Sequence, residues 1–512
     1  MGENDMNHLA VAGKRFLLRR GGFLLKGGIV LTWLVLVGFL VERTLWQPQA
    51  LKITPLLAKE GMKAGEAWWG IYFKDEKIGY AVTAQQQQVE KILVREKGVL
   101  KLSVLGVPQS IEQTLEYQTD QNLILESFDF SLKSGLIKFQ LGGRMEEDTS
   151  GAGKKLKIKI QSGGKERQQE ISLPEAPYIL SQTKLYFLAQ GLEKGKKYRI
   201  PAFDPATLSN AEMIAEVEGI ERLHIGGEER DLYRVREDFR GIMVRAWMDR
   251  DGEVWKEESP TGLVLLRESK NVAMYKNWAP GKTADLIALT AIPVNREIEN
   301  PRATRYLRAR LLFTAVDGLP LGGNRQWRIG NEIIIHKEDF PIRPSVYKPL
   351  PEAFREEALR STPFIQSDDP EIKAQAESIV KETEDASERV RRVAAWVYGE
   401  LEKRPVVSIP SAIEVLHQKM GDCNEHAVLF TALVRALGIP AHMQAGILYQ
   451  DGKFFYHAWA KVYLGAWVSV DPVLNQVPAD ATHICLVEGD LDRQLDILRM
   501  MGRLKVEVLE VR

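Results

Sequence analysis

Cysteine is scarce in this sequence, and its scarcity excludes two ways of stabilising a fold. Only two cysteines, Cys423 and Cys485, occur in 512 residues. Two thiols cannot build a disulfide framework or a zinc cluster, although they could pair with each other. The composition, with 45% hydrophobic and 27% charged residues, is that of a globular protein.

An excess of charge of one sign is absent as well. Lysine and arginine together number 69, as do aspartate and glutamate. Such a balance gives no bulk electrostatic reason for binding nucleic acid, so we predict no nucleic-acid partner. Residues 50–277 also lack a glycine-rich phosphate loop and any His, Asp and Glu cluster with ligand spacing. We therefore predict neither a cofactor nor a metal.

One uncharged hydrophobic stretch, Gly27–Val41, lies near the N-terminus. With the apolar residues just beyond it, the stretch extends over residues 27–46, close to the roughly 20 residues that a membrane span needs, and we predict a transmembrane anchor there. Basic residues before it predict that residues 1–26 stay in the cytoplasm: Lys14, Arg15, Arg19, Arg20 and Lys26. Since no clear small-x-small cleavage site follows, we expect an uncleaved anchor with the bulk of the chain outside the cytoplasm.

The length of the chain suggests two to four domains. Alternation of apolar and polar residues predicts a large antiparallel β-rich domain over residues 50–277, with a hairpin turn at Asp251-Gly252. We interpret this domain as a scaffold or a recognition module. Two helices are expected inside it, over residues 178–190 and 209–214. A linker over residues 278–303 and a small β segment over residues 304–345 are expected after it.

From Asp369 the pattern changes to helices followed by strands. Pro370 suits the first turn of a helix, and Ser411 with Glu414 predicts a capping box at another helix. Helices packed against an antiparallel sheet predict an α+β domain over residues 366–490. We expect helices over residues 370–382 and 387–402. Strands are expected over residues 442–449, 454–464 and 467–471, and a C-terminal tail with an edge strand over residues 491–512.

The stretch Gly421-Asp422-Cys423-Asn424-Glu425-His426-Ala427 predicts the start of a further helix. Asp422 suits the N-cap, and Glu425 three residues on completes a capping box. Cys423 then lies at the positive end of the helix dipole, which favours the thiolate, the nucleophilic form of cysteine. His426 could share a helix face with Cys423, but this thin Cys/His signal is more typical of a packed or capping histidine than of a metal ligand.

A hairpin after this helix is predicted to join a histidine to an aspartate. If the loop is Tyr463-Leu464-Gly465, then Lys461 faces Trp467 and His457 faces Asp471. Directly opposed residues share a face, with Cβ atoms roughly 5 Å apart. A carboxylate on one imidazole nitrogen fixes the tautomer and leaves the other nitrogen for a nucleophile. Cys423, His457 and Asp471 thus predict a Cys-His-Asp catalytic arrangement.

These blocks of sequence resemble the transglutaminase-like superfamily of microbial proteins. The resemblance rests on the motif around Cys423, on Ala436-Leu437-Gly438-Ile439-Pro440-Ala441, on His457-Ala458-Trp459 and on Trp467-Val468-Ser469-Val470-Asp471-Pro472. It covers about residues 370–490 and implies a papain-like fold in which the nucleophile, the base and the orienting carboxylate are Cys423, His457 and Asp471. It also implies a periplasmic or cell-surface setting for the bulk of a single-pass membrane protein.

Two functions stay open at this stage. One is a membrane-anchored cysteine-dependent acyltransferase, peptidase or amidase that acts on a protein or peptide of the cell envelope and transfers the acyl group to an amine or to water. The other is a catalytically idle scaffold or binding protein of the envelope. The expected fold class is α+β, with an N-terminal membrane helix, a large antiparallel β-rich domain and a C-terminal transglutaminase-like α+β domain.

Overall fold

A computed structural model describes most of the chain after residue 64. The described residues are 65–104, 106–135, 137–147, 153–162, 164–184, 191–275, 285, 290–313, 322–323, 325–341, 348–406, 408–490 and 495–512. The predicted anchor, residues 27–46, and the basic segment before it lie outside these residues.

The expected placement in a membrane is corrected by the structure. Across the described residues, no helix combines the length and the apolar character that crossing a bilayer requires. A single-pass membrane protein, with its bulk in the periplasm or outside the cell, is therefore not supported, and neither is the membrane helix named in the expected fold class.

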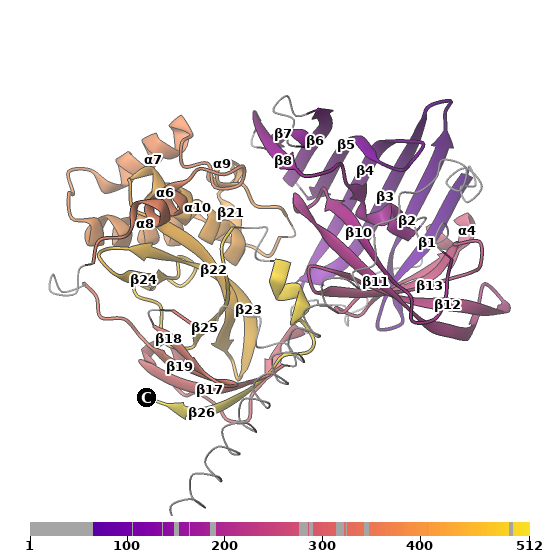
Figure 1. The fold of residues 1–512 in the computed structure, drawn as a ribbon. Coiled ribbons are helices and arrows are strands. Elements are labelled where there is room, and N and C mark those ends of the chain that lie inside the picture. Colours follow the sequence, from indigo (N-terminus) through magenta and orange to yellow (C-terminus); the bar gives the residue numbers. More distant parts are fainter. Residues whose placement is uncertain are drawn as a thin grey trace, which may run out of the picture. The chain divides into compact units, whose positions relative to one another are not determined.

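The described chain begins with one large antiparallel sheet (Figure 1). Its strand order is β8-β7-β6-β5-β4-β3-β2-β1-β15-β14-β13-β12-β11-β10-β9, so two meanders meet where β1 pairs with β15. The strands of this sheet among the described residues are β1 (Gly65–Phe73), β2 (Glu76–Gln87), β3 (Lys91–Val104), β4 (Val107–Asp120), β5 (Leu125–Ser134), β6 (Ile137–Glu147), β7 (Lys154–Ser162), β8 (Lys165–Leu173), β9 (Tyr178–Ile179), β10 (Lys197–Asp204), β11 (Ser209–Ile225), β12 (Glu228–Phe239), β13 (Ile242–Met248), β14 (Val254–Glu258) and β15 (Leu263–Glu268).

The two meanders share one hydrophobic core. Buried residues of β3 and β7, such as Val94 and Ile158, belong to the same cluster as Phe203 of β10 and Met248 of β13. Alternation along each strand explains how the sheet buries one face, since every second side chain points the same way. A short 3-10 helix, η1 (Leu180–Gln182), and the helix α4 (Lys270–Met274) accompany the sheet.

One of the two helices expected inside this domain is corrected. Residues 209–214 belong to β11, where Ser209 pairs with Asp204 and Ile214 with Arg199 of β10. Of the helix expected over residues 178–190, residues 178–182 form β9 and η1, residues 183 and 184 are helical, and residues 185–190 lie outside the described residues. Pairing with neighbouring strands here outweighs the helix propensity of the residues Ala211, Glu212 and Met213.

The C-terminal part contains two further sheets. One has the order β16-β23-β22-β25 with β24 paired to β23, and the other has the order β18-β19-β17-β26. Buried side chains of β17, β19 and β26 pack against those of β22, β23 and β25. The strands are β16 (Ile292–Pro293), β17 (Tyr306–Leu312), β18 (Gln326–Ile329), β19 (Glu332–His336), β22 (Ala441–Gln450), β23 (Lys453–Tyr463), β24 (Trp467–Val470), β25 (His483–Glu488) and β26 (Lys505–Val511), besides the two-stranded pair β20 (Glu402–Lys403) and β21 (Met420–Gly421).

A group of helices packs against the sheet of β22, β23 and β24 (Figure 1). They are α6 (Glu352–Leu359), α7 (Pro370–Val380), α8 (Ala386–Glu400), α9 (Ala412–Gln418) and α10 (Cys423–Ala436), with the 3-10 helices η2 (Pro301–Ala303) and η5 (Leu495–Arg499) elsewhere in this part. Pro370 lies in the first turn of α7, as expected, and Asp369 caps that helix, but Ser411 makes no side-chain cap at α9, so the capping box predicted there is wrong. Helix α10 is buried along most of its length and lies between the other helices and the sheet.

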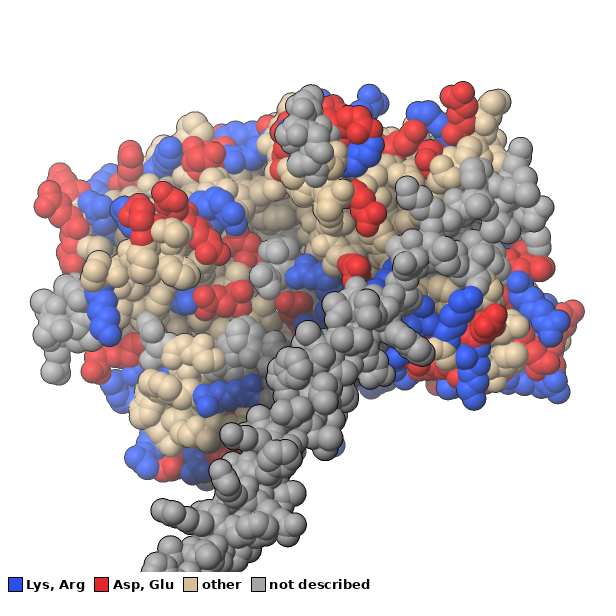
Figure 2. Space-filling view, in the orientation of Figure 1, with Lys and Arg blue, Asp and Glu red and all other residues tan. Residues whose placement is uncertain are grey.

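The expected fold class, α+β, is wrong for the chain as a whole. The structure is mostly β, with 52% of residues in strands and 18% in helices. Helices are concentrated between residues 352 and 436, whereas strands build the whole of the large sheet and two layers of the C-terminal part. Figure 2 shows Lys and Arg interspersed with Asp and Glu over the visible face, in keeping with the balanced composition.

Candidate active site

Helix α10 places Cys423 at its first position. The Asp422 side chain accepts a hydrogen bond from the Asn424 N–H at 2.8 Å, and the Glu425 carboxylate accepts one from the Asp422 N–H at 2.9 Å. The predicted capping box is therefore confirmed. Gly421 permits the tight approach of Glu425, because a Cβ at position 421 would lie 2.2 Å from the Glu425 Cβ. The motif around the cysteine thus fixes the start of the helix.

The electrostatic state of Cys423 differs from the expectation. Burial raises the pKa of the Cys423 thiol well above its ordinary value, and the neighbouring Asp422 carboxyl raises it further. A backbone hydrogen bond from Ala458 acts in the opposite direction but does not outweigh them. The helix dipole alone favours the thiolate, whereas the buried surroundings and the Asp422 carboxyl favour the thiol.

This state predicts slow alkylation near neutral pH. In a Cys485→Ala chain, which leaves a single thiol, we expect iodoacetamide to react with Cys423 more slowly at pH 7 than with an exposed cysteine of pKa about 8.5. Since the pKa of Cys423 is raised, its rate should still be increasing above pH 9. Mass spectrometry of the labelled chain between pH 6 and 10 measures this profile. Half-maximal alkylation below pH 8 would contradict the prediction.

His457 and Asp471 are in direct contact. His457 lies on β23, and its Nε2 is 2.9 Å from Oδ2 of Asp471, which directly follows β24. The ring of Trp459, two residues along the strand, stacks on the imidazole with centroids 6.1 Å apart. Bonding of Nε2 to the carboxylate leaves Nδ1 for another group. The predicted pair is thus brought together.

The register that brings them together is not the predicted one. Lys461 pairs with Ser469 and Tyr463 with Trp467, so the loop is residues 464–466 and every partner lies two positions further along than expected. A shift of two residues keeps each side chain on its face of the sheet, because the side-chain period is two. His457 and Asp471 are consequently diagonal neighbours and not directly opposed ones.

Cys423 lies beside this pair. Its thiol is hydrogen-bonded by the backbone of Ala458, the residue after His457, and the charge of Asp471 is close enough to raise its pKa. Helix α10 and strand β23 pack directly on each other. Within the described residues, however, no hydrogen bond joins the Cys423 sulfur to the His457 ring. The three predicted residues are therefore gathered at one place, with the thiol not yet bonded to its base.

Asp471 is held by four hydrogen bonds in a fully buried position. Its Oδ1 accepts the backbone N–H groups of Val473 at 2.8 Å and Leu474 at 3.1 Å, and its Oδ2 accepts from His457 and from His483, each at 2.9 Å. Burial alone would raise the pKa of Asp471. The imidazole of His457 and the hydrogen bonds from both histidines outweigh burial and hold that pKa well below its usual range.

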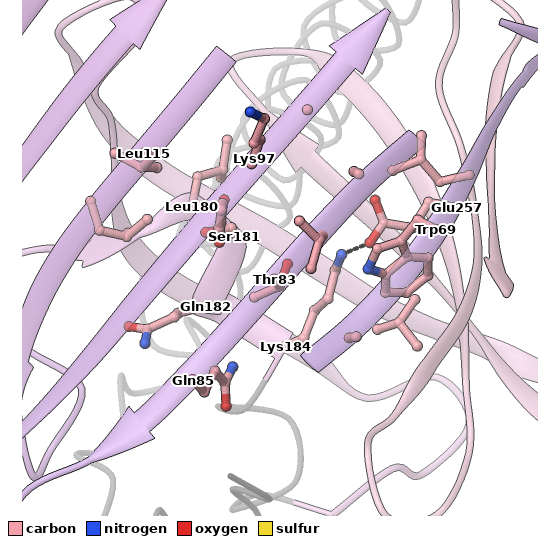
Figure 3. Close-up of a pocket in the computed structure, with 18 of the residues that line it drawn as sticks. Trp69, Thr83, Gln85, Lys97, Leu115, Leu180, Ser181, Gln182, Lys184 and Glu257 are labelled. Carbon is pink, nitrogen blue, oxygen red and sulfur yellow. Dashed lines mark hydrogen bonds and ion pairs between the residues drawn. The ribbon is translucent and has the colours of Figure 1, made fainter. Parts of the chain in front are cut away.

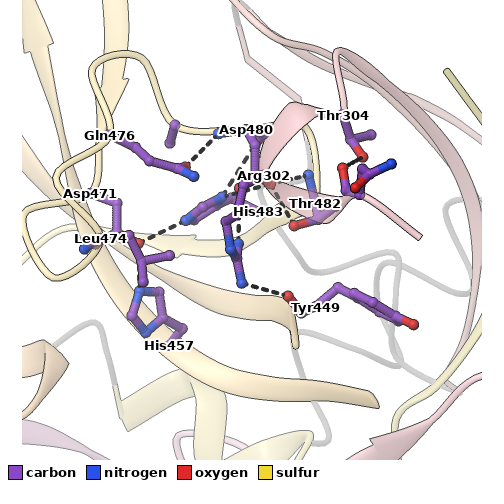
Figure 4. Close-up of polar contacts among 12 residues, drawn as sticks. Arg302, Thr304, Tyr449, His457, Asp471, Leu474, Gln476, Asp480, Thr482 and His483 are labelled. Carbon is purple, nitrogen blue, oxygen red and sulfur yellow. Dashed lines mark hydrogen bonds and ion pairs between the residues drawn. The ribbon is translucent and has the colours of Figure 1, made fainter. Parts of the chain in front are cut away.

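His483 is a member of the site that the sequence analysis missed. This fully buried ring, at the start of β25, contacts Asp471 through Nε2 and Asp480 through Nδ1, at 3.2 Å from the carbonyl and 3.3 Å from Oδ1 (Figure 4). With both carboxyls ionised, both partners are hydrogen-bond acceptors, and this geometry favours a proton on each ring nitrogen, which is the imidazolium form of His483. Burial opposes this charge, but the two carboxylates outweigh it and raise the pKa of His483.

Asp480 connects this imidazolium to an arginine. Arg302 Nη1 lies 2.9 Å from Asp480 Oδ2, while its Nη2 donates to the Tyr449 carbonyl at 2.9 Å. The spacing Asp480-Ala481-Thr482-His483, directly before a strand, is the only signal of this network in the sequence. Because Arg302 is 178 residues from Asp480 along the chain, that spacing alone could not reveal the network.

A metal is not needed to explain these residues. His457, Asp471 and His483 bring three ligand atoms within 4.8 Å of one another, but both ring nitrogens involved already donate to Asp471. His426 is bonded through Nδ1 to the Asp422 carbonyl at 2.7 Å, as a capping histidine would be, and burial lowers its pKa. We interpret both groups as hydrogen-bond networks.

Comparison with known proteins places a family within this part of the chain. The model of the Transglutaminase-like superfamily matches residues 373–472, which confirms the resemblance seen in the motifs. No curated protein matches the chain.

Solved structures of low identity are also similar to the chain. A putative cysteine protease from Cytophaga hutchinsonii is 17% identical, with 43% of this chain and 83% of that chain covered and a TM-score of 0.25. A putative protease from Parabacteroides distasonis is 9% identical, with 68% and 69% covered and a TM-score of 0.19. A β-barrel-like protein of domain of unknown function DUF1849 from Brucella abortus is 11% identical, with 40% and 95% covered and a TM-score of 0.31.

Proposed function

Residues 373–472 form a domain of the transglutaminase-like superfamily, and from that premise we propose that the protein is a thiol-dependent enzyme acting on amide or peptide bonds through a thioester on Cys423. The observation that carries the proposal is the 2.9 Å bond between His457 Nε2 and Asp471 Oδ2. It leaves His457 Nδ1 for the thiol that α10 holds beside the same strand. Nucleophile, base and orienting carboxylate are then in the order that acyl transfer requires.

The raised pKa of Cys423 determines how the first step proceeds. No preformed thiolate is required in this step, because the thiol proton passes to His457 Nδ1 as the sulfur attacks the substrate carbonyl carbon. The oxyanion formed is within reach of the Cys423 backbone N–H at the helix start. Collapse of this intermediate breaks the C–N bond, and His457 returns the proton to the leaving amine.

The second step releases the acyl group. Water or a second amine loses a proton to His457 and adds to the thioester carbonyl, and the C–S bond breaks as the sulfur regains a proton. Water yields a carboxylic acid, and an amine yields a new amide. The substrate class we propose is a protein or peptide, because its amides supply the carbonyl that this chemistry needs.

Trapping of the thioester tests the proposal. The full chain is incubated with a diverse peptide mixture and hydroxylamine, which captures an acyl-enzyme as a peptide hydroxamate detected by mass spectrometry. We expect hydroxamates from the unaltered chain and from Cys485→Ala, the matched control, and none from Cys423→Ala. Cys423→Ala should fold, because it removes a single sulfur atom from a partly exposed position. Equal hydroxamate yields from Cys423→Ala would refute the assignment.

A catalytically idle domain is the second candidate, favoured by one observation. The Cys423 thiol has a raised pKa and, in the part of the chain that the structure describes, no hydrogen bond to His457, as expected of a site that is not poised for attack. An idle domain predicts no hydroxamate from any variant, and a binding role would then replace the catalytic one.

A further inference from the structure

A cavity of about 690 Å³ lies inside the 15-stranded sheet domain. Its walls come from both meanders, with β1–β4 on one side and β10 and β12–β15 on the other, and η1 contributes as well. Ligand pockets in proteins are of this size, and they combine an apolar lining with a few polar groups. The apolar lining here includes Trp69, Ile71, Leu115, Ile179 and Leu265.

Carboxyl groups outnumber cations among the buried groups of this cavity. The Lys184 ammonium is paired with Glu257 beside Trp69 (Figure 3). Glu96 and Glu237 also line the cavity and feel the same ammonium, but burial dominates and raises the pKa of both. Glu237 is 8% exposed, and its Oε1 has no hydrogen-bond partner. Glu96 accepts a hydrogen bond from the Tyr117 hydroxyl at 3.1 Å, whereas Glu237 keeps an unpaired oxygen and shares the Lys184 charge with two other glutamates.

The other cations on the cavity wall do not pair with Glu237, because they are paired elsewhere. Arg267 lies 3.8 Å from Glu253, and Lys97 is bonded to Glu112 at 2.7 Å. Asp204, a half-buried carboxyl on the wall, accepts hydrogen bonds from the Thr207 hydroxyl at 2.7 Å and the Ala206 N–H at 3.1 Å, and the Arg240 charge acts on it. Glu237 is therefore left on the cavity wall with an oxygen that no described residue bonds.

Gln182 supplies an independent sign of a missing ligand. It lines the cavity from η1 and is 3% exposed, yet among the described residues neither its Nε2 nor its Oε1 has a hydrogen-bond partner. A buried amide without partners is costly, so such groups are rare in folded proteins. A ligand amide, with one donor and one acceptor, is the group that satisfies both atoms of a glutamine side chain.

We propose that this cavity binds a small organic cation that carries an amide group, as the amino-terminal end of a short peptide does. The ammonium group is received by Glu237 and Glu96, the amide pairs with Gln182, and the apolar side chain packs against Trp69 and Leu115. This site is formed by residues 65–267 alone. It does not depend on the chemistry proposed for Cys423.

Leucinamide is a suitable probe because it combines an ammonium group, an amide and an isobutyl group. Isothermal titration calorimetry uses the full chain carrying Cys423→Ala, so that the probe cannot be consumed, at pH 6.5, where the amine is protonated. We expect leucinamide to bind at least about tenfold more tightly than N-acetyl-leucinamide, which lacks the charge. Equal affinity for the two compounds, or no heat from leucinamide at millimolar concentration, overturns the proposal.

Two variants on strand β12 locate the site. Glu237→Gln should weaken leucinamide binding at least about tenfold, whereas Glu229→Gln, an exposed position on the same strand, should leave it unchanged. Because Glu237→Gln removes a buried carboxylate without a hydrogen-bonded cation, we also expect it to raise the melting temperature at neutral pH. Unchanged binding in a folded Glu237→Gln chain overturns the assignment. Should this variant not fold, the comparison of the two ligands on the unaltered cavity still decides the proposal.

Discussion

Replacement of Asp471 by asparagine is expected to lower turnover by about four orders of magnitude. The amide keeps the shape of the side chain but can donate as well as accept, so it favours the wrong tautomer of His457. It also withdraws the negative charge that stabilises the imidazolium formed when His457 takes the thiol proton. The hydroxamate assay measures the loss, with the exposed turn variant Asp451→Asn as a control. A reduction of less than tenfold would remove Asp471 from the proposed mechanism.

The same variant is expected to destabilise the fold. Asp471 is fully buried and bonded to two histidines, and breaking such a charged network by removing one partner costs about 3–5 kcal/mol of unfolding free energy. Because the folded-state pKa of Asp471 is lowered, its stabilisation is present above the unfolded pKa of about 3.9 and is lost as pH falls through the folded value. Urea unfolding should therefore show the deficit in full at pH 7 and its disappearance only in strong acid.

The second large effect is expected at His483. Replacing this buried imidazolium by glutamine leaves Asp480 and Asp471 short of a positive charge, and we expect a loss of about 3–5 kcal/mol in unfolding free energy at pH 6. Turnover should fall too, since Asp471 loses one of the bonds that orient it. The exposed His224→Gln is the matched control, and its unfolding free energy should change by less than about 0.5 kcal/mol.

The pH dependence distinguishes this charge from ordinary packing. The folded-state pKa of His483 is raised, so its stabilisation is complete below the unfolded pKa of about 6.5 and is lost as pH rises through the folded value. The unfolding free energies of the unaltered chain and of His483→Gln should therefore converge in alkali. The charged groups that face the ring are Asp471, Asp480 and, behind Asp480, Arg302. A difference between the two chains that is constant from pH 6 to 10 would mean that His483 is neutral in the fold.

The hairpin shows which part of the site a sequence can determine. His457 and Asp471 are predicted together by counting outward from a three-residue loop at Tyr463-Leu464-Gly465. The observed loop has the same length but lies one position later, at residues 464–466, so the predicted partner of Lys461 is wrong by two positions. His457 and Asp471 still share a face of the sheet, because the register differs from the predicted one by two residues and the side-chain period is two.

Other features depended on how the elements pack together and could not be predicted from local patterns. The helix dipole is a local property and suggested a thiolate at Cys423, but burial and the Asp422 carboxyl determine the pKa. His483 is protonated only because Asp480 and Asp471 converge on it, and that convergence is set by the sheet. Likewise, residues 209–214 pair with strand β10 and do not form the expected helix. Local signals were sufficient for caps and faces, and insufficient for charge states and strand partners.

The junction between β1 and β15 has a consequence for how the chain is made. All other antiparallel pairs in the large sheet join neighbours along the chain, but Phe73 pairs with Leu263, which is separated from it by 263 − 73 = 190 residues. At a synthesis rate of roughly 5–20 residues per second, β1 waits on the ribosome for roughly 10–40 seconds before its partner emerges. During that time its edge, with the apolar side chains Trp69, Ile71 and Phe73, is open to pairing with other chains. Newly made protein should thus depend on chaperones that shield such edges, more than its finished, fully paired sheet would suggest.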